Sequence, residues 1–337
     1  MKKILVTGGL GFIGSHTVVE LQNEGFEVVI IDNLSNTTIS VLDSITEITG
    51  IKPTFHKVDV RVKSEVKSVF DAHKIDGIIH FAAYKAVGES MGKPLEYYEN
   101  NLSSLIYILQ EMRDRKLDNF IFSSSCTVYG QADELPITEK AAVKAAESVY
   151  GNTKQIGEEI IKDASNAHNL QCIALRYFNP IGAHASIKIG ELPLGVPQNL
   201  IPFVTQTAAG IRKELSVFGD DYPTEDGTAI RDYIHVVDLA KAHIAALKRL
   251  IDKNNKKAFE CFNIGTGKGS SVLDIITTFE KVNNLKLNYK IVGRREGDIV
   301  AAFADTTTAN KELNWKTEMS LEESLESAWK WQQKQSV

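Results

Sequence analysis

Several features that would place a chain in a special class are scarce in this sequence. Among its 337 residues, no apolar run approaches the ~18 residues of a membrane span. The formal net charge is -5 at pH 7, and Lys and Arg do not cluster anywhere along the chain. Nucleic-acid surfaces need concentrated positive charge, so the sequence argues against both a membrane protein and a nucleic-acid partner.

Cysteine is also rare, because the chain contains only Cys126, Cys172 and Cys261. Their spacing is not that of a metal site, and the last two lie in apolar, strand-like runs. The first apolar run ends at Gly8, which is too early for an export signal. We therefore expect reduced thiols, no bound metal and a cytoplasmic protein.

The first half of the chain alternates short β-branched runs with amphipathic stretches. We predict strands at 4–7, 27–32, 54–58, 77–82, 119–123 and 172–177, and their continuous apolar character suits parallel strands covered on both faces. The clearest helix follows Pro94, where apolar residues recur at helical spacing from Leu102 to Met112. This alternation is typical of an α/β fold with a doubly wound parallel Rossmann sheet.

The composition changes after Phe178. Segment 190–202 carries three prolines and two glycines, and segment 219–227 is acidic and rich in turn residues. We expect a Rossmann domain at 1–178 and a smaller, interleaved C-terminal substrate domain at 179–227 and 263–337. The segment at about 228–262 is expected to return to the sheet.

A glycine-rich loop follows the first strand and opens a helix. Gly8, Gly11 and Gly14 permit a tight turn and close approach to a pyrophosphate, which the free N–H groups of the helix would bind. Asp32 ends the second strand, where its carboxylate can bind both ribose hydroxyls of NAD and would repel a 2′-phosphate. We therefore expect NAD rather than NADP. Asp59 ends the third strand, where it would either lie near the adenine or cap the next helix.

Tyr150 and Lys154 are four residues apart, so on a helix they share one face. An ammonium near a phenol favours the phenolate, which can take a proton from a sugar hydroxyl. Acting near neutrality requires lowering a phenol pKa by about 3 units, which is more than one lysine supplies without an oxidised nicotinamide ring. Ser123-Ser124-Ser125 ends the fifth strand at the expected ligand crevice, where hydroxyls either orient a substrate alcohol or satisfy the backbone.

Further motifs carry a resemblance that covers nearly the whole chain. They are Gly8 to Gly14, Lys85-Ala86-Val87-Gly88-Glu89-Ser90, Lys93-Pro94-Leu95-Glu96-Tyr97-Tyr98, Arg176-Tyr177-Phe178-Asn179-Pro180, Pro223-Thr224-Glu225-Asp226-Gly227, Arg231-Asp232-Tyr233-Ile234-His235-Val236 and Arg295-Glu296-Gly297-Asp298. With these motifs the sequence resembles the UDP-galactose 4-epimerases of the extended short-chain dehydrogenase/reductase family. It departs from the usual family pattern at Phe12, Ala83 and Cys126, which alter bulk near the cofactor.

The resemblance implies NAD-dependent C4 epimerisation of UDP-hexoses through a transient 4-keto sugar. It implies Tyr150 as the acid/base, Lys154 as its electrostatic partner and Ser125 as a bridge to the sugar, with Ser124 and Thr127 nearby. The implied cofactor-binding residues are Gly8, Gly11, Phe12, Ile13, Gly14, Asp32, Asn33, Asn36, Asp59, Val60, Phe81, Ala82, Ala83, Lys85, Asn100, Ser123, Tyr150, Lys154 and Tyr177. The implied substrate-binding residues are Ser125, Tyr150, Asn179, Asn199, Leu200, Ser216, Phe218, Arg231, Arg295, Asp298 and Ala302.

The family's dimers suggest a homodimer formed by the helical segments 94–115 and 150–168. Those helices would equally well pack only on the sheet, and the sequence does not decide between the two arrangements. Ala302 falls where the family carries either a tyrosine or a small residue beside the sugar's C2 substituent. A small residue there predicts that N-acetylated UDP-hexoses are also substrates, unless Ala302 is simply part of the core.

Two other functions compete with epimerisation. A nucleotide-sugar 4,6-dehydratase begins with the same oxidation, but that family carries an acidic pair after the threonine of the serine block. Here Val128 and Tyr129 follow Thr127, so the elimination lacks its catalyst. An NAD-sensing protein without activity would have no use for Ser125, Tyr150 and Lys154 together.

Overall fold

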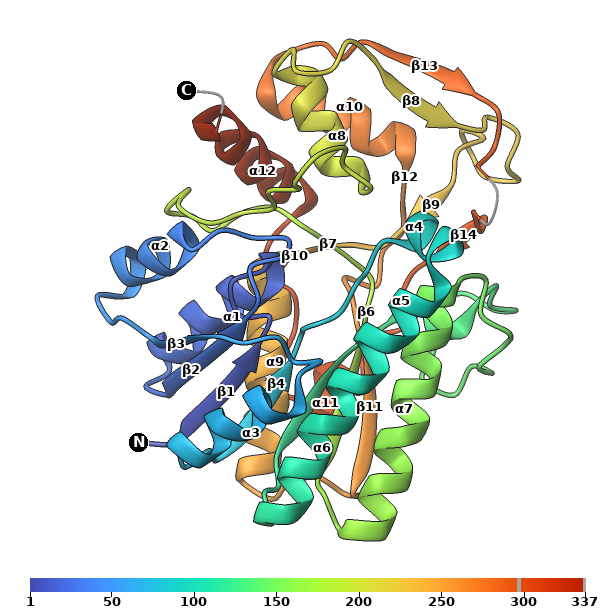
Figure 1. Ribbon diagram of the computed structural model, residues 1–337. Helices are drawn as coiled ribbons and strands as arrows, with labels where there is room; N and C mark the ends of the chain where they lie inside the picture. The colour runs from blue at the N-terminus through green and yellow to red at the C-terminus, as the bar shows by residue number, and fades with distance from the viewer. Residues whose placement is uncertain (296–297, 336–337) are drawn as a thin grey trace.

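A seven-stranded parallel sheet forms the centre of the computed structural model, which describes residues 1–295 and 298–335 (Figure 1). Its strand order is β3-β2-β1-β4-β5-β6-β11, and every neighbouring pair is parallel. The strands are β1 (Lys3–Thr7), β2 (Glu27–Asp32), β3 (Thr54–Lys57), β4 (Gly77–His80), β5 (Phe120–Ser125), β6 (Cys172–Tyr177) and β11 (Phe259–Ile264). The order reverses at β1, and this confirms the predicted doubly wound Rossmann sheet.

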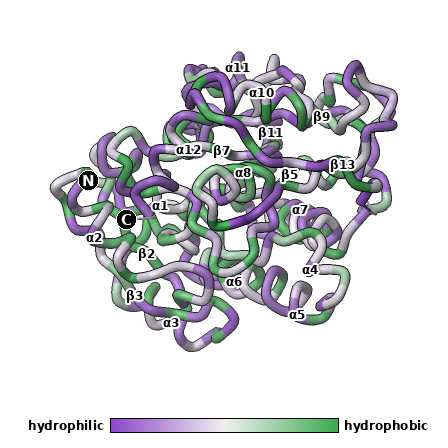
Figure 2. Tube along the Cα trace, turned by 90° about the horizontal axis from the view of Figure 1, so that it is seen from above, coloured by the Kyte–Doolittle hydropathy of each residue, from purple (hydrophilic) through white to green (hydrophobic). Residues whose placement is uncertain are grey.

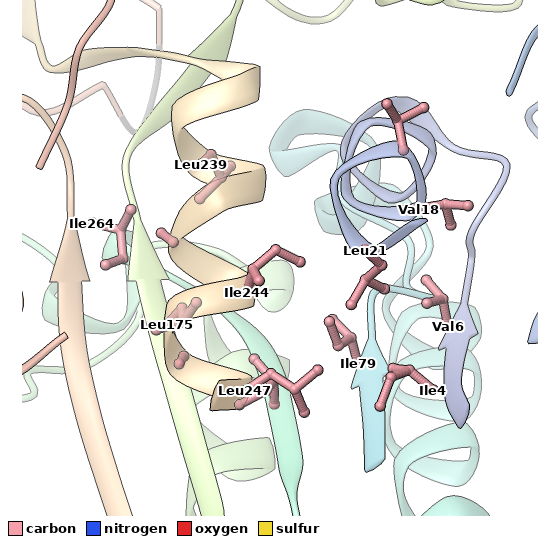
Figure 3. Close-up of a cluster of buried hydrophobic side chains, with 14 of the residues drawn as sticks. Ile4, Val6, Val18, Leu21, Ile79, Leu175, Leu239, Ile244, Leu247 and Ile264 are labelled. Carbon is pink, nitrogen blue, oxygen red and sulfur yellow. The ribbon is translucent and has the colours of Figure 1, made fainter. Parts of the chain in front are cut away.

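Helices cover both faces of this sheet. On one face, α1 (Phe12–Asn23), α2 (Ser40–Thr49) and α9 (Val236–Ile251) pack with inward strand residues such as Ile4 and Val6. Figure 3 shows that contact, where Leu21 of α1 and Leu247 of α9 meet the sheet. On the other face, α3 (Lys63–Ala72), α6 (Ser104–Arg115) and α7 (Val149–His168) pack against Leu5 and its neighbours. Successive strand residues point to opposite faces, so continuous apolar strands supply both cores.

A second set of elements lies beyond the carboxyl ends of the strands (Figure 1). Their core joins α8 (Leu200–Ala208), α10 (Val272–Asn283), α12 (Leu321–Gln335) and β8 (Leu215–Phe218), which pairs with β13 (Tyr289–Val292). Short strand pairs link this region to the sheet: β7 (Asn179–Ile181) with β10 (Tyr233–His235), and β9 (Ile230–Arg231) with β12 (Ser270–Ser271) and β14 (Ala301–Ala302). A short helix, α11 (Thr307–Glu312), packs near β11.

The segment after Pro94 is less regular than its apolar spacing indicates. It follows α4 (Val87–Gly92) and consists of α5 (Pro94–Tyr98), a π-helical turn (η1, Glu99–Ser103) and α6. The π turn buries Asn101, whose side-chain amide donates to the Tyr84 carbonyl and to Thr153 Oγ1, both at 3.0 Å. These bonds attach the loop after β4 to α7, and a π turn of this kind is typical of functional sites.

Polar and apolar residues alternate along most of the helices, as Figure 2 shows by colour. Over residues 1–295 and 298–335, no helix has the length and apolar character needed to cross a membrane.

Candidate functional site

An open cleft with about 880 Å³ of empty space runs across the carboxyl ends of β1, β2, β4 and β5. Its lining contains the predicted cofactor residues Gly8, Gly11, Phe12, Ile13, Gly14, Asp32, Asn33, Asn36, Val60, Phe81, Ala82, Ala83, Lys85, Asn100, Ser123, Tyr150, Lys154 and Tyr177. Parallel strands present their carboxyl ends at one edge, so residues distant in the sequence meet here.

The glycine loop forms one end of the cleft. Gly8 has a φ of +67°, and a Cβ there would lie 2.9 Å from the Ala82 nitrogen. A Cβ at Gly14 would collide with the Gly8 carbonyl oxygen. The loop therefore needs glycine at both positions to bring its backbone close to the neighbouring strand and to a ligand.

Asp32 closes the wall beside this loop. Its two carboxylate oxygens accept from the backbone N–H groups of Leu34 at 2.9 Å and Leu10 at 3.2 Å. Burial raises the pKa of Asp32, while those two bonds oppose the shift. The side chain is thus fixed at the cleft wall, where it can accept from sugar hydroxyls.

Asp59 itself is not among the residues that line the cleft. Its neighbours Val58 and Val60 line the wall, whereas the Asp59 carboxylate pairs with Arg61 at 2.6 Å. That guanidinium lowers the pKa of Asp59 to about 2. Nor does Asp59 cap α3, because the N-cap position is Val62 and no side chain bonds there. The Asp59 carboxylate also accepts from the side-chain amide of Asn33, which lines the cleft, at 3.3 Å, so a place near the adenine stays a prediction.

The opposite end of the cleft holds the predicted catalytic group. Tyr150 lies in the first turn of α7, where Ser148 caps the helix by accepting from the Gly151 N–H at 3.0 Å. A bond from the Tyr150 N–H to Ser90 Oγ, at 3.1 Å, attaches the same turn to α4. Lys154 follows one turn later and donates from Nζ to the Ser123 carbonyl at 2.7 Å. The first two turns of α7 and the carboxyl end of β5 thus bring Tyr150, Lys154 and the serines together.

The electrostatics of Tyr150 differ from a simple tyrosine–lysine pair. Burial raises the pKa of Tyr150 well above its ordinary value, and the hydrogen bond to Ser125 only partly offsets this. Lys154 Nζ lies 5.8 Å from the centre of the phenol ring and 4.8 Å from that of Phe122. Burial lowers the pKa of Lys154 to about 7. The protein alone therefore keeps the phenol protonated, and additional positive charge in the cleft is needed to favour the phenolate.

Alternation along β5 places Ser123 and Ser125 on one face of the sheet and Ser124 on the other. The Ser123 hydroxyl bonds the Tyr177 hydroxyl at 2.6 Å, and both side chains line the cleft. Ser125 neighbours Tyr150 and also accepts from the Thr127 N–H at 3.2 Å. Ser124 faces away from the sugar position expected for it and donates to Glu158 at 2.5 Å. Thr127 Oγ1 is buried without a partner.

The predicted substrate residues other than Tyr150 lie outside the lining of the cleft. Four of them form a second cluster, in which Arg295 donates to Asp298 at 2.7 Å and Arg231 lies 3.7 Å from the same carboxylate. The Arg295 guanidinium sits 5.6 Å from the centre of the Phe218 ring. Glu296 and Gly297, the middle of that motif, lie outside the described residues. Arg231 is close enough to Cys126 to affect its pKa, which places the cluster near the Tyr150 end.

The other predicted substrate residues are more dispersed. Asn199 precedes α8 and donates to Glu191 at 2.7 Å, beside Leu200. Asn179 pairs with Tyr233 across β7 and β10, and Ser216 shares one face of β8 with Phe218. Ala302 is 3% exposed and belongs to a small core cluster with Val128, Tyr129, Ile137 and Phe178. Its contacts are thus those of a core residue, as one reading of the sequence had it.

Sequence reasoning missed part of the cleft wall and its support. Ile31, Ser35, Val58 and Tyr84 also line the cleft, and each adjoins a residue that was predicted. Glu158 and Arg176 form a buried ion pair at 2.6 Å behind the serines. An arginine inside the otherwise apolar run 172–177 was the available signal. Burial raises the pKa of the Cys126 thiol to about 12, which disfavours the thiolate that a nucleophilic cysteine needs.

Comparisons with known proteins agree with this geometry. The family described as GDP-mannose 4,6 dehydratase matches residues 5–328. The UDP-glucose 4-epimerase of Drosophila melanogaster is 47% identical over 336 residues, covering 98% of this chain and 96% of that protein. The enzyme of the same name from Bacillus subtilis is 48% identical over 330 residues, with coverage of 98% and 96%.

Solved structures give the same result. A UDP-glucose 4-epimerase from Stenotrophomonas maltophila, with bound NAD and formylated UDP-arabinopyranose, has a TM-score of 0.96, 46% identity and coverage of 100% and 99%. One from Bifidobacterium longum, in complex with NAD+ and UDP, has a TM-score of 0.95, 46% identity and coverage of 99% and 98%. Identity at this level over the full length decides the assignment: the chain belongs to the UDP-glucose 4-epimerase family.

Proposed function

We propose that this protein interconverts UDP-galactose and UDP-glucose by NAD-dependent epimerisation at C4. The observation that carries the proposal is the arrangement of one cleft, with a phosphate-binding glycine loop and Asp32 at one end and Tyr150, Lys154 and Ser125 at the other. The family relationship supports the same reaction. The first end suits a dinucleotide and the second suits proton transfer from a sugar.

NAD fits the residues that form the cleft. The glycine loop and the N-terminus of α1 would hold the pyrophosphate, Asp32 the adenosine ribose, and Lys154 the nicotinamide ribose. No cation lies within the segment Asn33 to Thr38 to bind a 2′-phosphate, so NAD is favoured over NADP. When bound, NAD supplies a reversible hydride acceptor beside the sugar.

In the proton-transfer step, Tyr150 takes the 4-hydroxyl proton as the C4–H bond breaks, which yields a 4-keto sugar. Ser125 bonds Tyr150 and holds the sugar oxygen beside it. Lys154 in its charged form stabilises the phenolate together with the oxidised nicotinamide ring. Tyr150 then returns the proton to the sugar oxygen after the keto sugar has presented its other face. The hydride lost from C4 would be held by bound NAD and come back to that face, so no net oxidation occurs.

The second cluster anchors the nucleotide while the sugar turns. Arg231 and Arg295 suit a diphosphate because guanidinium groups make charge-assisted, fork-like bonds. Asp298, Phe218, Ser216, Asn179, Asn199 and Leu200 complete the UDP site in this proposal. Binding energy from the remote nucleotide keeps the keto intermediate in place although the sugar itself is held loosely.

The dehydratase alternative, despite the description of the matching family, lacks its acid and base. Val128 and Tyr129 occupy the positions of the expected acidic pair, and both are fully buried. An NAD sensor without activity does not need a tyrosine base bonded to a serine. Epimerisation accounts for these residues better than either alternative.

Several wider properties belong to the same proposal. We propose a Rossmann domain at 1–178 with a return at about 228–262, since α9 and β11 lie on and in the sheet. Free thiols at Cys126, Cys172 and Cys261 support a reducing, cytoplasmic location.

We also propose a homodimer through α6 and α7, which light scattering of the purified protein would test. Because Ala302 is small, we further propose activity on N-acetylated UDP-hexoses.

A redox-balance experiment tests the reaction. Purified protein incubated with UDP-galactose and no added cofactor should form UDP-glucose, because the bound NAD is regenerated within each turnover. Absorbance at 340 nm in the protein-free filtrate should stay at baseline. Stoichiometric NADH in that filtrate would instead identify a net dehydrogenase.

A further inference from the structure

Behind the serines lies a buried polar network that the reaction described above does not use. Arg176 donates from Nε and from its second terminal nitrogen to the two oxygens of Glu158, at 2.9 and 2.6 Å. Ser124 donates to the same carboxylate at 2.5 Å. Arg176 also donates to the Tyr129 hydroxyl at 2.9 Å, and Tyr129 donates to Asn263 at 2.7 Å. The side chains of Arg176 and Glu158 are only 8% and 9% exposed.

This network joins α7, which carries Tyr150 and Lys154, to β5, which carries Ser125. Ser124 and Arg176 are register partners on β5 and β6, so they share one face of the sheet. Glu158 lies on α7 one turn after Lys154, on the same side of the helix. The bidentate pair therefore fixes α7 against the two strands that carry Ser125 and Tyr177, and Ser124 adjoins Ser125 directly.

The network also faces Lys154. The titratable groups around that ammonium are Tyr150 and Glu158 on α7, His80 on β4, and Tyr177 on β6 through Ser123. Burial lowers the pKa of His80 to about 3 and raises the pKa of Tyr177 to about 12, so both stay neutral near pH 7. Glu158 is then the negative charge facing Lys154, and it raises the pKa that burial depresses.

We propose that Glu158, held by Arg176 and Ser124, is a positioning residue of the epimerase, which sets the Tyr150–Ser125 distance and supplies the counter-charge of Lys154. This inference rests on the proposed function, because the base and its ammonium must act as a pair. Arg176 donates to both oxygens of the carboxylate, and a buried acid requires such partners. Ser124, which the sequence placed beside the sugar, instead belongs to this support.

The test compares Glu158→Gln with a matched control on the same sheet. Glu260 on β11 forms a bidentate pair with Arg249 of α9, and these side chains are 9% and 7% exposed. Glu260→Gln therefore removes an equally buried charge remote from Tyr150. We expect Glu158→Gln to lower kcat on UDP-galactose at least tenfold beyond Glu260→Gln, with KM within about twofold of wild type. Ser124→Ala, which keeps the charge, should lower kcat about threefold.

The pH dependence separates positioning from folding. In Glu158→Gln the alkaline limb of the kcat profile should move to lower pH by at least half a unit, because Lys154 loses its counter-charge. In Ser124→Ala and Glu260→Gln that limb should match wild type. An unmoved limb, or a loss of kcat no greater than in Glu260→Gln, overturns the proposal.

A second measurement does not depend on turnover. Titration of the Lys154 resonance in NAD-loaded protein carrying 13Cε-lysine should show a lower midpoint in Glu158→Gln than in Glu260→Gln. Equal midpoints refute the charge role even if the protein is active. If wild type and Glu260→Gln do not epimerise UDP-galactose, the proposed function fails, whereas the lysine titration still decides the role of Glu158 toward Lys154.

Discussion

At the scale of single residues, the chemistry depends on a tyrosine that the protein alone keeps neutral. Burial raises the pKa of Tyr150, and Lys154 donates to a backbone carbonyl rather than to the phenol. We expect Tyr150→Phe to lower kcat by about 10²–10⁴, the usual effect of losing a general acid–base group. The affinity for UDP, measured by calorimetry, should stay within twofold because the ring packing is retained.

The control for this prediction is Tyr107→Phe on α6, which removes a hydroxyl from a helix without touching the cleft. It should keep wild-type activity. Substantial turnover by Tyr150→Phe would show that another group is the base and that the assigned face of α7 is wrong.

Ala302 carries a prediction about the range of sugars. It is buried beside Val128 and Phe178, on the strand that pairs with Arg231. We expect wild type to epimerise UDP-N-acetylglucosamine as well as UDP-glucose. Ala302→Tyr should abolish the first activity and spare the second, because added bulk overlaps the acetyl group before it reaches a hydroxyl.

The measurement is kcat/KM for both substrate pairs, with thermal unfolding to verify that the variant folds. A parallel loss on both pairs would mean that Ala302 acts only in core packing. Failure of wild type to turn over either acetylated sugar would remove the proposed range altogether.

At the scale of elements, the sequence predicted the strands well and the helix junctions poorly. Strands such as Glu27–Asp32 are largely continuous apolar runs, which can be recognised from the local sequence without knowledge of tertiary contacts. The π turn at Glu99–Ser103 depends on bonds from Asn101 to distant residues, which a local pattern cannot contain. The same reason hid the Glu158–Arg176 pair. Motif positions in the cleft were predictable because a Rossmann sheet always brings its strand ends together.

The close packing of α1 on β1 gives a prediction at this scale. In Gly14→Ala the new Cβ would collide with the Gly8 carbonyl oxygen and lie 2.9 Å from Gly9 Cα, so the glycine loop must move. Overpacking of this kind costs about 1–3 kcal/mol of unfolding free energy. We expect Gly14→Ala to bind NAD at least tenfold more weakly than wild type. The affinity is measured by titrating NAD into protein from which the bound cofactor has been removed.

Gly92→Ala is the matched control, because a Cβ there meets no atom within 4 Å. It sits at the end of α4, where alanine is favoured over glycine by up to about 1 kcal/mol. Both its stability and its NAD affinity should equal or exceed those of wild type. If Gly14→Ala retained full affinity as well, the loop would not be the pyrophosphate site.

At the scale of the whole molecule, the chain is interleaved between the sheet and the second core, so we expect the two parts to unfold cooperatively. Along the sequence, α9 and β11, which belong to the sheet and its covering layer, follow α8 and β8 of the second core. Four histidines are buried within this structure, His16, His80, His235 and His243, at 1%, 2%, 2% and 0% exposure. Burial lowers their pKa values to about 3, 3, 4 and 4, respectively.

These histidines predict how the stability of the protein responds to acid. Each folded pKa lies below the unfolded value of about 6.5, so between those values the unfolded chain binds more protons. Their contribution is therefore fully present above pH 6.5 and is lost as the pH falls toward the folded pKa. From pH 7 to pH 5, each histidine would lower the unfolding free energy by at most about 2 kcal/mol.

The measurement is urea unfolding at both pH values for three proteins: wild type, His243→Phe and His168→Gln. His243→Phe keeps a ring between Phe81 and Tyr177 but cannot titrate, and His168 lies at the exposed end of α7. His243→Phe should lose about 1–2 kcal/mol less than wild type over this interval, whereas His168→Gln should lose as much as wild type. The same loss in all three proteins would mean that His243 gains a proton without unfolding, and that acid acts on this fold through other groups.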